Sequence, residues 1–441
     1  MHVAGWASRE PRRRGDVTGR QRAARSPGRW SWRLVAWSVF VACLVVGSPF
    51  PSAGHAGERP LARAQWATTT QSLSPAEALD LDFRAMSGDT LNLGPFQGDI
   101  WLRLWLDGSE MGERRWLSVR WPYARDFRFY LVGSRSADGK PSLLEWREGA
   151  HPIGLPAIPT DPGRLLPAFD GKRQFLLRLS ADGPTAMQLT LDSVQTERNR
   201  LLSRYLLFGI YLGAMLGMAT YSLFLMLALR ERTYAGYAAF LAATVLYVGL
   251  RYNVLGPLLP EFLHWMSPAR QAQLAVALMA LSGIGFVRRF LQSPRDDPRA
   301  DRVLQLLMLL ALSTVPASAA LSGELSSLLV MGMVVATVLG IFWAAWRSMG
   351  RGFRPAFNLL ISWSMFAVVV LLYLAMLLGV LPYSAVLTLG LPLGSLALAL
   401  LLAFALGSRI RHKQREEAAL ERDRDRYRFL SERDGLTGLY N

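Results

Sequence analysis

The stretch YLLFGIYLGAMLGMATYSLFLMLAL, residues 205–229, decides the class of this protein. It holds no charged side chain, and it is longer than the roughly 20 residues that a helix needs to cross the hydrocarbon core of a membrane. Six further apolar runs of similar character follow it: Tyr234–Leu250, Leu274–Phe290, Val303–Leu321, Ser326–Ala345, Ala356–Val380 and Ala385–Leu406. The sequence therefore predicts a membrane protein with a seven-helix transmembrane bundle over residues 200–407.

The positive residues between these runs predict an orientation. The loops after the first, third, fifth and seventh spans carry Arg230, Arg232, Arg288, Arg289, Arg295, Arg299, Arg302, Arg347, Arg351, Arg354, Arg409, Arg411, Lys413 and Arg415. The other loops hold only Arg251 and Arg270. Because cytoplasmic loops are enriched in Lys and Arg, we expect the C-terminus in the cytoplasm and the segment before the first span outside it. The net charge of +16 follows the same distribution and does not indicate a nucleic-acid surface.

The N-terminal region, residues 1–56, has the pattern of a secretory signal peptide. Nine arginines precede an apolar run from Leu34 to Gly47, and the small residues 52–56 follow it. An uncleaved anchor is the alternative, and a start codon downstream of Met1 is also open. Cys43, the single cysteine, lies in the apolar run. If this segment is removed, no cysteine remains for disulfides, thiol catalysis or thiolate metal sites.

Residues 57–199 have the pattern of an exported β domain. Residues 100–106 alternate, with Ile100, Leu102, Leu104 and Leu106 on one face and Trp101, Arg103 and Trp105 on the other. Further strands are predicted at Trp116–Trp121, Asp126–Val132, Gln174–Ser180 and Ala186–Leu191. Asp-Gly pairs, which favour tight hairpin turns, occur at 107–108, 138–139, 170–171 and 182–183. This combination predicts an all-β sandwich.

The aromatic residues of this domain have two interpretations. The residues concerned are Trp101, Trp105, Trp116, Trp121, Tyr130 and Trp146. One interpretation is a ligand-binding platform, formed by Trp101, Arg103 and Trp105, that stacks on a sugar or another ring. The other is that the aromatic residues pack the core and the edges of the sandwich. Packing is the favoured interpretation. No cluster of His, Asp and Glu has metal-ligand spacing, and no Ser/His/Asp arrangement is visible. We therefore expect no catalytic, metal or cofactor site in this chain.

The spans themselves favour a receptor over a pump. No Asp, Glu, Lys, Arg or His lies at the centre of any span, whereas ion-coupled transporters keep such residues near the midplane. Glycine recurs at every fourth residue in two spans. In the first span it occurs at Gly209, Gly213 and Gly217, and in the seventh at Gly390 and Gly394. Such spacing clears one helix face for a close neighbour. Packing within the bundle is the favoured interpretation, and a dimer face is the alternative.

Residues 408–432 turn polar and contain neither Pro nor Gly, which predicts a cytoplasmic linker helix. A heptad seam from Leu406 to Tyr427 is half polar, so a marginal coiled coil and a single solvated helix both stay open. His412 lies one turn beyond the seventh span and is interpreted as a solvated residue. No histidine follows it, and this absence, together with the C-terminal motif described next, argues against a histidine kinase.

The last residues, DGLTGLYN, resemble the D-x-L-T-G-L-x-N opening of GGDEF domains, the diguanylate cyclase family. Every fixed position of that opening is present: Asp434, Leu436, Thr437, Gly438, Leu439 and Asn441. They are interpreted as structural, because the family's Mg²⁺-binding and guanine-binding residues lie further on. We expect the chain to be the N-terminal part of a longer protein. Residues 433–441 are then the first residues of its output domain, and the rest of that domain is missing. The resemblance implies GTP and Mg²⁺ as substrate and metal of that missing domain, which acts as a homodimer.

The whole layout is similar to bacterial receptors with seven transmembrane helices and diverse intracellular signalling modules. The resemblance implies a periplasmic jelly-roll domain over residues 57–199 that binds a small molecule of carbohydrate-like type, and a place in the bacterial inner membrane. The expected function is control of a cytoplasmic diguanylate cyclase, which joins two GTP into cyclic di-GMP. A receptor without an enzyme is the first alternative. A small-solute transporter with an exported cap is the second, and it is less favoured because the span interiors are uncharged.

Overall fold

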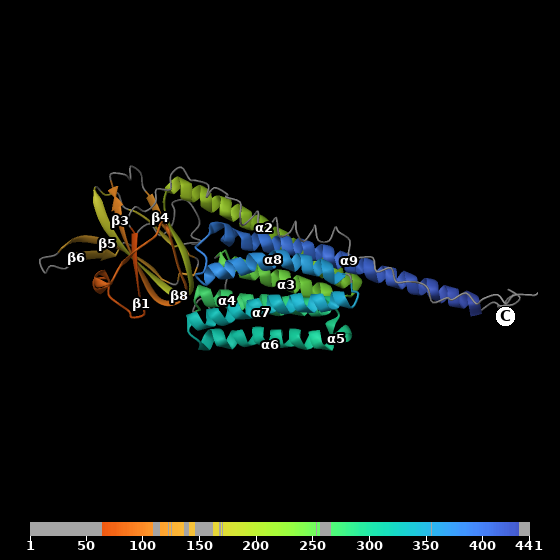
Figure 1. Ribbon diagram of the computed structural model, residues 1–441. Coiled ribbons are helices and arrows are strands. Elements are labelled where there is room, and N and C mark those ends of the chain that lie inside the picture. The colour runs from red at the N-terminus through yellow and green to blue at the C-terminus, as the bar shows by residue number, and fades with distance from the viewer. Residues whose placement is uncertain are drawn as a thin grey trace, which may run out of the picture.

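The computed structural model describes residues 64–431, with gaps at 109–114, 122, 125, 136–140, 146–161, 167–168, 170, 253, 256–265 and 354. A β-sheet domain stands at one end of a bundle of long helices, and the last helix extends far beyond the other end (Figure 1). The predicted signal peptide 1–56, Trp146 and the predicted GGDEF opening 434–441 lie outside the described residues.

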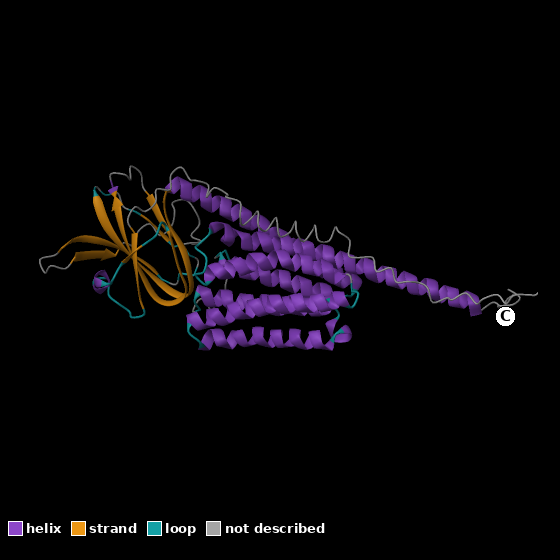
Figure 2. Ribbon diagram, viewed as in Figure 1, coloured by secondary structure: helices purple, strands orange, loops and turns teal. Residues whose placement is uncertain are grey.

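Among the described residues, eight strands form one sheet, and each of their pairings is antiparallel. The strands are β1 (Ala64–Thr69), β2 (Arg84–Ala85), β3 (Thr90–Asp107), β4 (Arg115–Arg120), β5 (Phe127–Arg135), β6 (Pro141–Glu145), β7 (Gly163–Leu165) and β8 (Lys172–Ser193). β3 pairs along most of β8, and the other edge of β8 pairs with β5 and then with β4. Both long strands bend, so one continuous sheet curls around the core (Figure 2).

The alternation predicted for residues 100–106 is confirmed. Ile100, Leu102, Leu104 and Leu106 are buried in the main core, where Phe129 stacks on Phe175 with ring centroids 5.2 Å apart. The opposite face is covered near Trp101 by the 3₁₀ helix η1 (Glu77–Asp80). Trp101, Tyr130 and Leu176 form a second buried cluster there with Ala78. Both faces of β3 therefore contribute to packing.

One predicted turn is wrong. The sequence predicts separate strands at Gln174–Ser180 and Ala186–Leu191 with a hairpin turn at Asp182-Gly183, but β8 runs unbroken through all of these residues. Gly183 has φ +143°, so it bends the strand where a turn was expected. An Asp-Gly pair favours positive φ both in a hairpin turn and in a bent strand. Only the pairing of β8 with β3 shows that this pair lies in a bent strand.

Within the part of the chain that the structure describes, seven helices are long and apolar enough to cross a membrane. They are α2 (Val194–Leu229), α3 (Arg232–Arg251), α4 (Pro268–Phe290), α6 (Pro298–Ala320), α7 (Gly323–Gly350), α8 (Pro355–Leu377) and α9 (Ala385–Ser431); the short α5 (Ser293–Asp296) precedes α6. Each contains one of the seven predicted spans or most of it. α2 is the least covered of them, with only 17% of its most apolar window buried.

The connections at the two ends of the bundle differ. α2 starts at the residue that follows β8, and the side chain of Ser193 caps it by accepting a hydrogen bond from the amide of Thr196 at 3.1 Å. The sequence placed the end of the β domain at residue 199, which lies within α2. α9 is one helix of 47 residues, about 70 Å long at 1.5 Å per residue, so no break separates its apolar half from its polar half.

Candidate functional site: the junction of sheet and helices

We call the surface where the bends of β3 and β8 meet the helices the junction, and we call that end of the bundle the sheet end. The pairing of β3 with β8 shifts register between Asn92 and Pro95, which marks the bend of β3. Gly94 has φ +72°, and a Cβ there would lie 2.9 Å from the carbonyl oxygen of Leu378. Gly379 has φ +80°, and a Cβ there would lie 3.2 Å from the amide nitrogen of Gly94. Only glycine fits both positions.

Asn92 fastens this bend to the helices. Its Nδ2 donates hydrogen bonds to the carbonyl oxygens of Met376, near the end of α8, and Leu381, before α9, both at 2.7 Å. Its Oδ1 accepts from the amide of Gly94 at 3.1 Å. One amide side chain therefore holds the strand and the α8–α9 connection together.

Replacing Asn92 by Asp is expected to loosen the junction. The carboxylate would face two carbonyl oxygens with no proton to donate, which costs about 1–3 kcal/mol. Thermal unfolding in detergent should show a lower midpoint. Asn358→Asp is the matched control, because Asn358 donates to the hydroxyl of Ser408, and that hydroxyl can turn from the carbonyl of Ala405 to donate to the new carboxylate. Equal midpoint shifts in both variants would contradict the role of Asn92.

Asp182 holds the bend of β8 over the first residues of α4 and α7. Its carboxylate is buried, accepts a hydrogen bond from Ser267 Oγ at 2.8 Å and pairs with Arg270 Nε at 3.3 Å. Ser267 is also the N-cap of α4. At the start of α7, Gly323 approaches so closely that a Cβ would collide with Asp182 Oδ1. The positive ends of two helix dipoles therefore meet at one carboxylate.

Arg251 forms the centre of an aromatic cluster at the same end of the bundle. It ends α3, is 4% exposed, and donates from Nε to the hydroxyl of Tyr373 at 2.7 Å. Its guanidinium carbon also lies 4.7 Å from the ring centroid of Tyr123, which follows β4, and 5.4 Å from that of Tyr252. Such cation–π contacts contribute about 2 kcal/mol or more when they are desolvated. The cluster joins sheet, α3 and α8 through a single cation.

The predicted ligand residues lie within the sheet. Trp101 has no exposed surface, stacks on Tyr130 at 6.3 Å and lies under the guanidinium of Arg178. Arg103 lies 3.8 Å from the ring centroid of Phe83 and donates to the carbonyl of Leu79. Trp105 is partly exposed.

The core-packing interpretation therefore holds for Trp101, and it also holds for the other aromatic residues of the predicted set that are buried: Trp116, Trp121 and Tyr130. Among the residues that the structure describes, no three His, Cys, Asp or Glu side chains are grouped as metal ligands.

The two predicted glycine faces behave differently. A Cβ built at Gly390 or Gly394 would contact Val369 of α8 at 3.5–3.6 Å, so the α9 glycines pack inside the bundle as predicted. A Cβ built at Gly209, Gly213 or Gly217 would meet no described atom within 4 Å. Among the described residues the α2 glycines therefore have no packing partner, which differs from the favoured interpretation. They lie on a face of α2, the least covered helix, that no described residue covers, and we call it the open glycine face.

The far end of the bundle, opposite the sheet, is fastened by charged side chains. Asp297 caps α6 and pairs with Arg347 at 2.8 Å and with Arg351. Hydrogen bonds from these two arginines hold the pKa of the Asp297 carboxyl well below its usual range. Its stabilising effect is therefore full above the unfolded pKa of about 4 and is lost only as the pH falls toward the lowered value. Arg409 of α9 is buried and donates to Thr233 Oγ1 at 2.9 Å.

Comparison with protein families agrees with this arrangement. Residues 204–409 match the family described as 7TM diverse intracellular signalling, and residues 63–193 match the family described as 7TMR-DISM extracellular 2. The order of the two matched regions, a β-sheet domain followed by seven apolar helices, fits the architecture of 7TMR-DISM receptors. The first match covers the spans from α2 to α9, and the second covers the sheet up to Ser193. No curated protein matches the chain significantly.

These matches indicate a multi-pass transmembrane signalling receptor with a sensor domain before its helices. The junction is the contact between the two matched regions, and the sequence alone does not reveal its three anchors. Asp182 was interpreted as a turn residue, Arg251 was counted only as a loop charge, and Asn92 had no distinguishing pattern. Their partners come from helices 85 to 289 positions away in the chain.

Proposed function

We propose that this receptor senses a small molecule outside the cytoplasm and controls a cytoplasmic diguanylate cyclase through α9. The observation that carries the proposal is that α9 is continuous: it begins beside the junction and extends far beyond the bundle toward the DGLTGLYN sequence (Figure 1). A stiff helix transmits displacement or rotation from one end to the other. The resemblance of residues 434–441 to a GGDEF opening supplies the kind of output, with GTP as substrate and Mg²⁺ as metal.

The proposed location is the bacterial inner membrane, with the sheet in the periplasm. The arginine-rich connections after α2, α4 and α7 lie at the far end, which supports a cytoplasmic far end by the enrichment of Lys and Arg there. The proposal of a carbohydrate-like ligand comes from the family resemblance. In the predicted platform, Trp105 is the tryptophan whose ring is partly exposed, so it is the one that could stack on such a ligand.

The test is to read the gene beyond codon 441 and to assay the complete product for cyclic di-GMP. We expect a frame that continues into a Gly-Gly-Asp/Glu-Glu-Phe domain and a product made from GTP in the presence of Mg²⁺. A frame that ends soon after Asn441 would refute cyclase control and leave a receptor without an enzyme. A domain of another kind would refute it as well.

A GGDEF output implies that the receptor works as a homodimer, and we propose the open glycine face of α2 as the contact. Gly213→Ile is expected to weaken dimerisation in nanodiscs by about tenfold, which equals roughly 1.4 kcal/mol of lost packing. Gly332→Ile is the matched control, since a Cβ at Gly332 of α7 also meets no described atom within 4 Å. Measured dimer fractions that fall equally in both variants would argue against the α2 face.

A further inference from the structure

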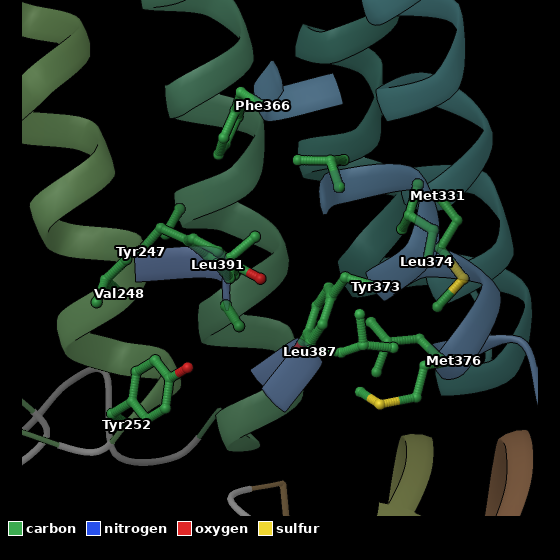
Figure 3. Close-up of a cluster of buried hydrophobic side chains, with 14 of the residues drawn as sticks. Tyr247, Val248, Tyr252, Met331, Phe366, Tyr373, Leu374, Met376, Leu387 and Leu391 are labelled. Carbon is green, nitrogen blue, oxygen red and sulfur yellow. The ribbon is translucent and has the colours of Figure 1, made fainter. Parts of the chain in front are cut away.

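A cavity of about 80 Å³ lies inside the bundle directly beneath the junction. Side chains from α3, α4, α7, α8 and α9 line it, together with Tyr123 and Pro184 of the sheet domain. Several lining side chains, among them Tyr247, Phe366 and Leu391, come from different helices and lie around the same space (Figure 3). None of the described lining residues is charged, and most are apolar.

One polar group in this lining lacks a partner. Gln273 of α4 is 7% exposed, and its Nε2 donates to Ser326 Oγ at 3.2 Å and Ser327 Oγ at 3.0 Å. Both serine hydroxyls donate to the carbonyl of Gly323, so they act toward Gln273 only as acceptors, which fixes the amide orientation. Its Oε1 is buried without a donor among the described residues. An unpaired buried acceptor costs about 1–3 kcal/mol.

Water would find few free partners in this space. A buried water usually makes about three hydrogen bonds, and several other polar groups of the lining are engaged elsewhere. Thr244 donates to the carbonyl of Phe240, Ser395 is bonded to Tyr211, and Tyr373 accepts from Arg251. A molecule with an apolar body and a single donor would satisfy Gln273 and fill the remaining surface.

We propose that this cavity binds a small uncharged molecule with an apolar body and one O–H or N–H group, which donates a hydrogen bond to Oε1 of Gln273. An apolar cavity of about 150 Å³ accommodates benzene, so the occupant here is smaller, of the size of a short alcohol or amide. The absence of charge among the described lining residues excludes ions, because a buried ion needs a partner.

The position of the cavity gives its occupant a regulatory role. The same space touches Tyr123 and Pro184 of the sheet domain and Leu391 and Ser395 of α9. An occupant with different affinities for two arrangements of these elements shifts the balance between them. This consequence for output rests on the proposed function, whereas binding itself does not.

The test uses the full chain in nanodiscs and two probes of the same shape, 2,2,2-trifluoroethanol and 1,1,1-trifluoropropane, followed by ¹⁹F NMR. Wild-type protein is expected to bind both saturably. Gln273→Leu and Gln273→Met should weaken trifluoroethanol binding by about tenfold or more and leave trifluoropropane binding unchanged. Ala272→Leu, which extends a lining side chain into the cavity, should abolish saturable binding of both probes.

Two results would overturn the proposal: no saturable binding of trifluoroethanol to wild type, or equal trifluoroethanol affinity in wild type and both Gln273 variants. Thermal midpoints of the variants identify any that misfold, and two substitutions at Gln273 guard against that outcome. Cyclic di-GMP is measured separately in the complete protein. Binding without an effect on product would refute the regulatory role or cyclase control and retain the site.

Discussion

Insertion of two alanines after Glu417 is expected to change basal cyclic di-GMP production of the complete receptor at least about tenfold. Each helical residue turns the chain by about 100°, so two residues rotate everything beyond them by about 200°. Glu417 lies in the exposed part of α9, where an insertion disturbs no described packing. The rotation would misalign the two output domains of a dimer. Production is measured in cells and with purified protein in nanodiscs.

Insertion of seven alanines at the same place is the control. Seven residues turn the helix by about 700°, which returns it to within about 20° of its original phase while lengthening it further. Production close to that of the unmodified receptor is therefore expected. A decrease that follows only the length of the insert would mean that the helix acts as a tether, and the proposed transmission through α9 would then be wrong.

Replacing Asp182 by Asn is expected to release the sheet from α4 and α7. The substitution keeps the shape of the side chain, but it removes the charge that pairs with Arg270 and faces two helix N-termini. Because Arg270 is partly exposed, we expect a loss of about 2–3 kcal/mol, below the roughly 3–5 kcal/mol for breaking a fully buried pair. Hydrogen exchange should become faster at the first turns of both helices, and the thermal midpoint should fall.

Asp99→Asn is the matched control for this experiment. Asp99 is a buried carboxylate on β3, and it pairs with Arg178 of β8 at 2.6 Å inside the sheet. Its loss should destabilise the sheet and leave exchange at the start of α4 and α7 as in the wild type. Faster exchange at those helices in both variants would show that they respond to general loosening of the sheet, and the special role of Asp182 would be refuted.

The parts of this structure that follow from local pattern were predictable from the sequence. Hydropathy located all seven spans, because a membrane requires a long uncharged run whatever surrounds it. Alternation identified the buried face of β3, since side chains on a strand point to opposite faces in turn. These signals need only neighbouring residues.

The junction was not predictable, because its contacts join segments that are distant in the chain. Nothing near Asp182 distinguishes a turn from a bend that meets two helices, and nothing near Gly213 indicates whether its face meets another helix or lipid. Gln273 stands at the edge of a predicted span, where a polar residue is common. Only the packing of α4 against α7 shows that Oε1 of Gln273 is buried without a hydrogen-bond donor among the described residues.

The direct passage from β8 into α2 sets a rule for exchanging sensor domains between receptors of this architecture. A grafted domain would need a final strand that ends on a capping residue such as Ser193, because no flexible linker exists to absorb a change in direction. It would also need counterparts of Asn92 and Asp182 to engage the helices. A chimera that keeps only the covalent connection should insert into the membrane and fold, but its output should not respond to the ligand of the new domain.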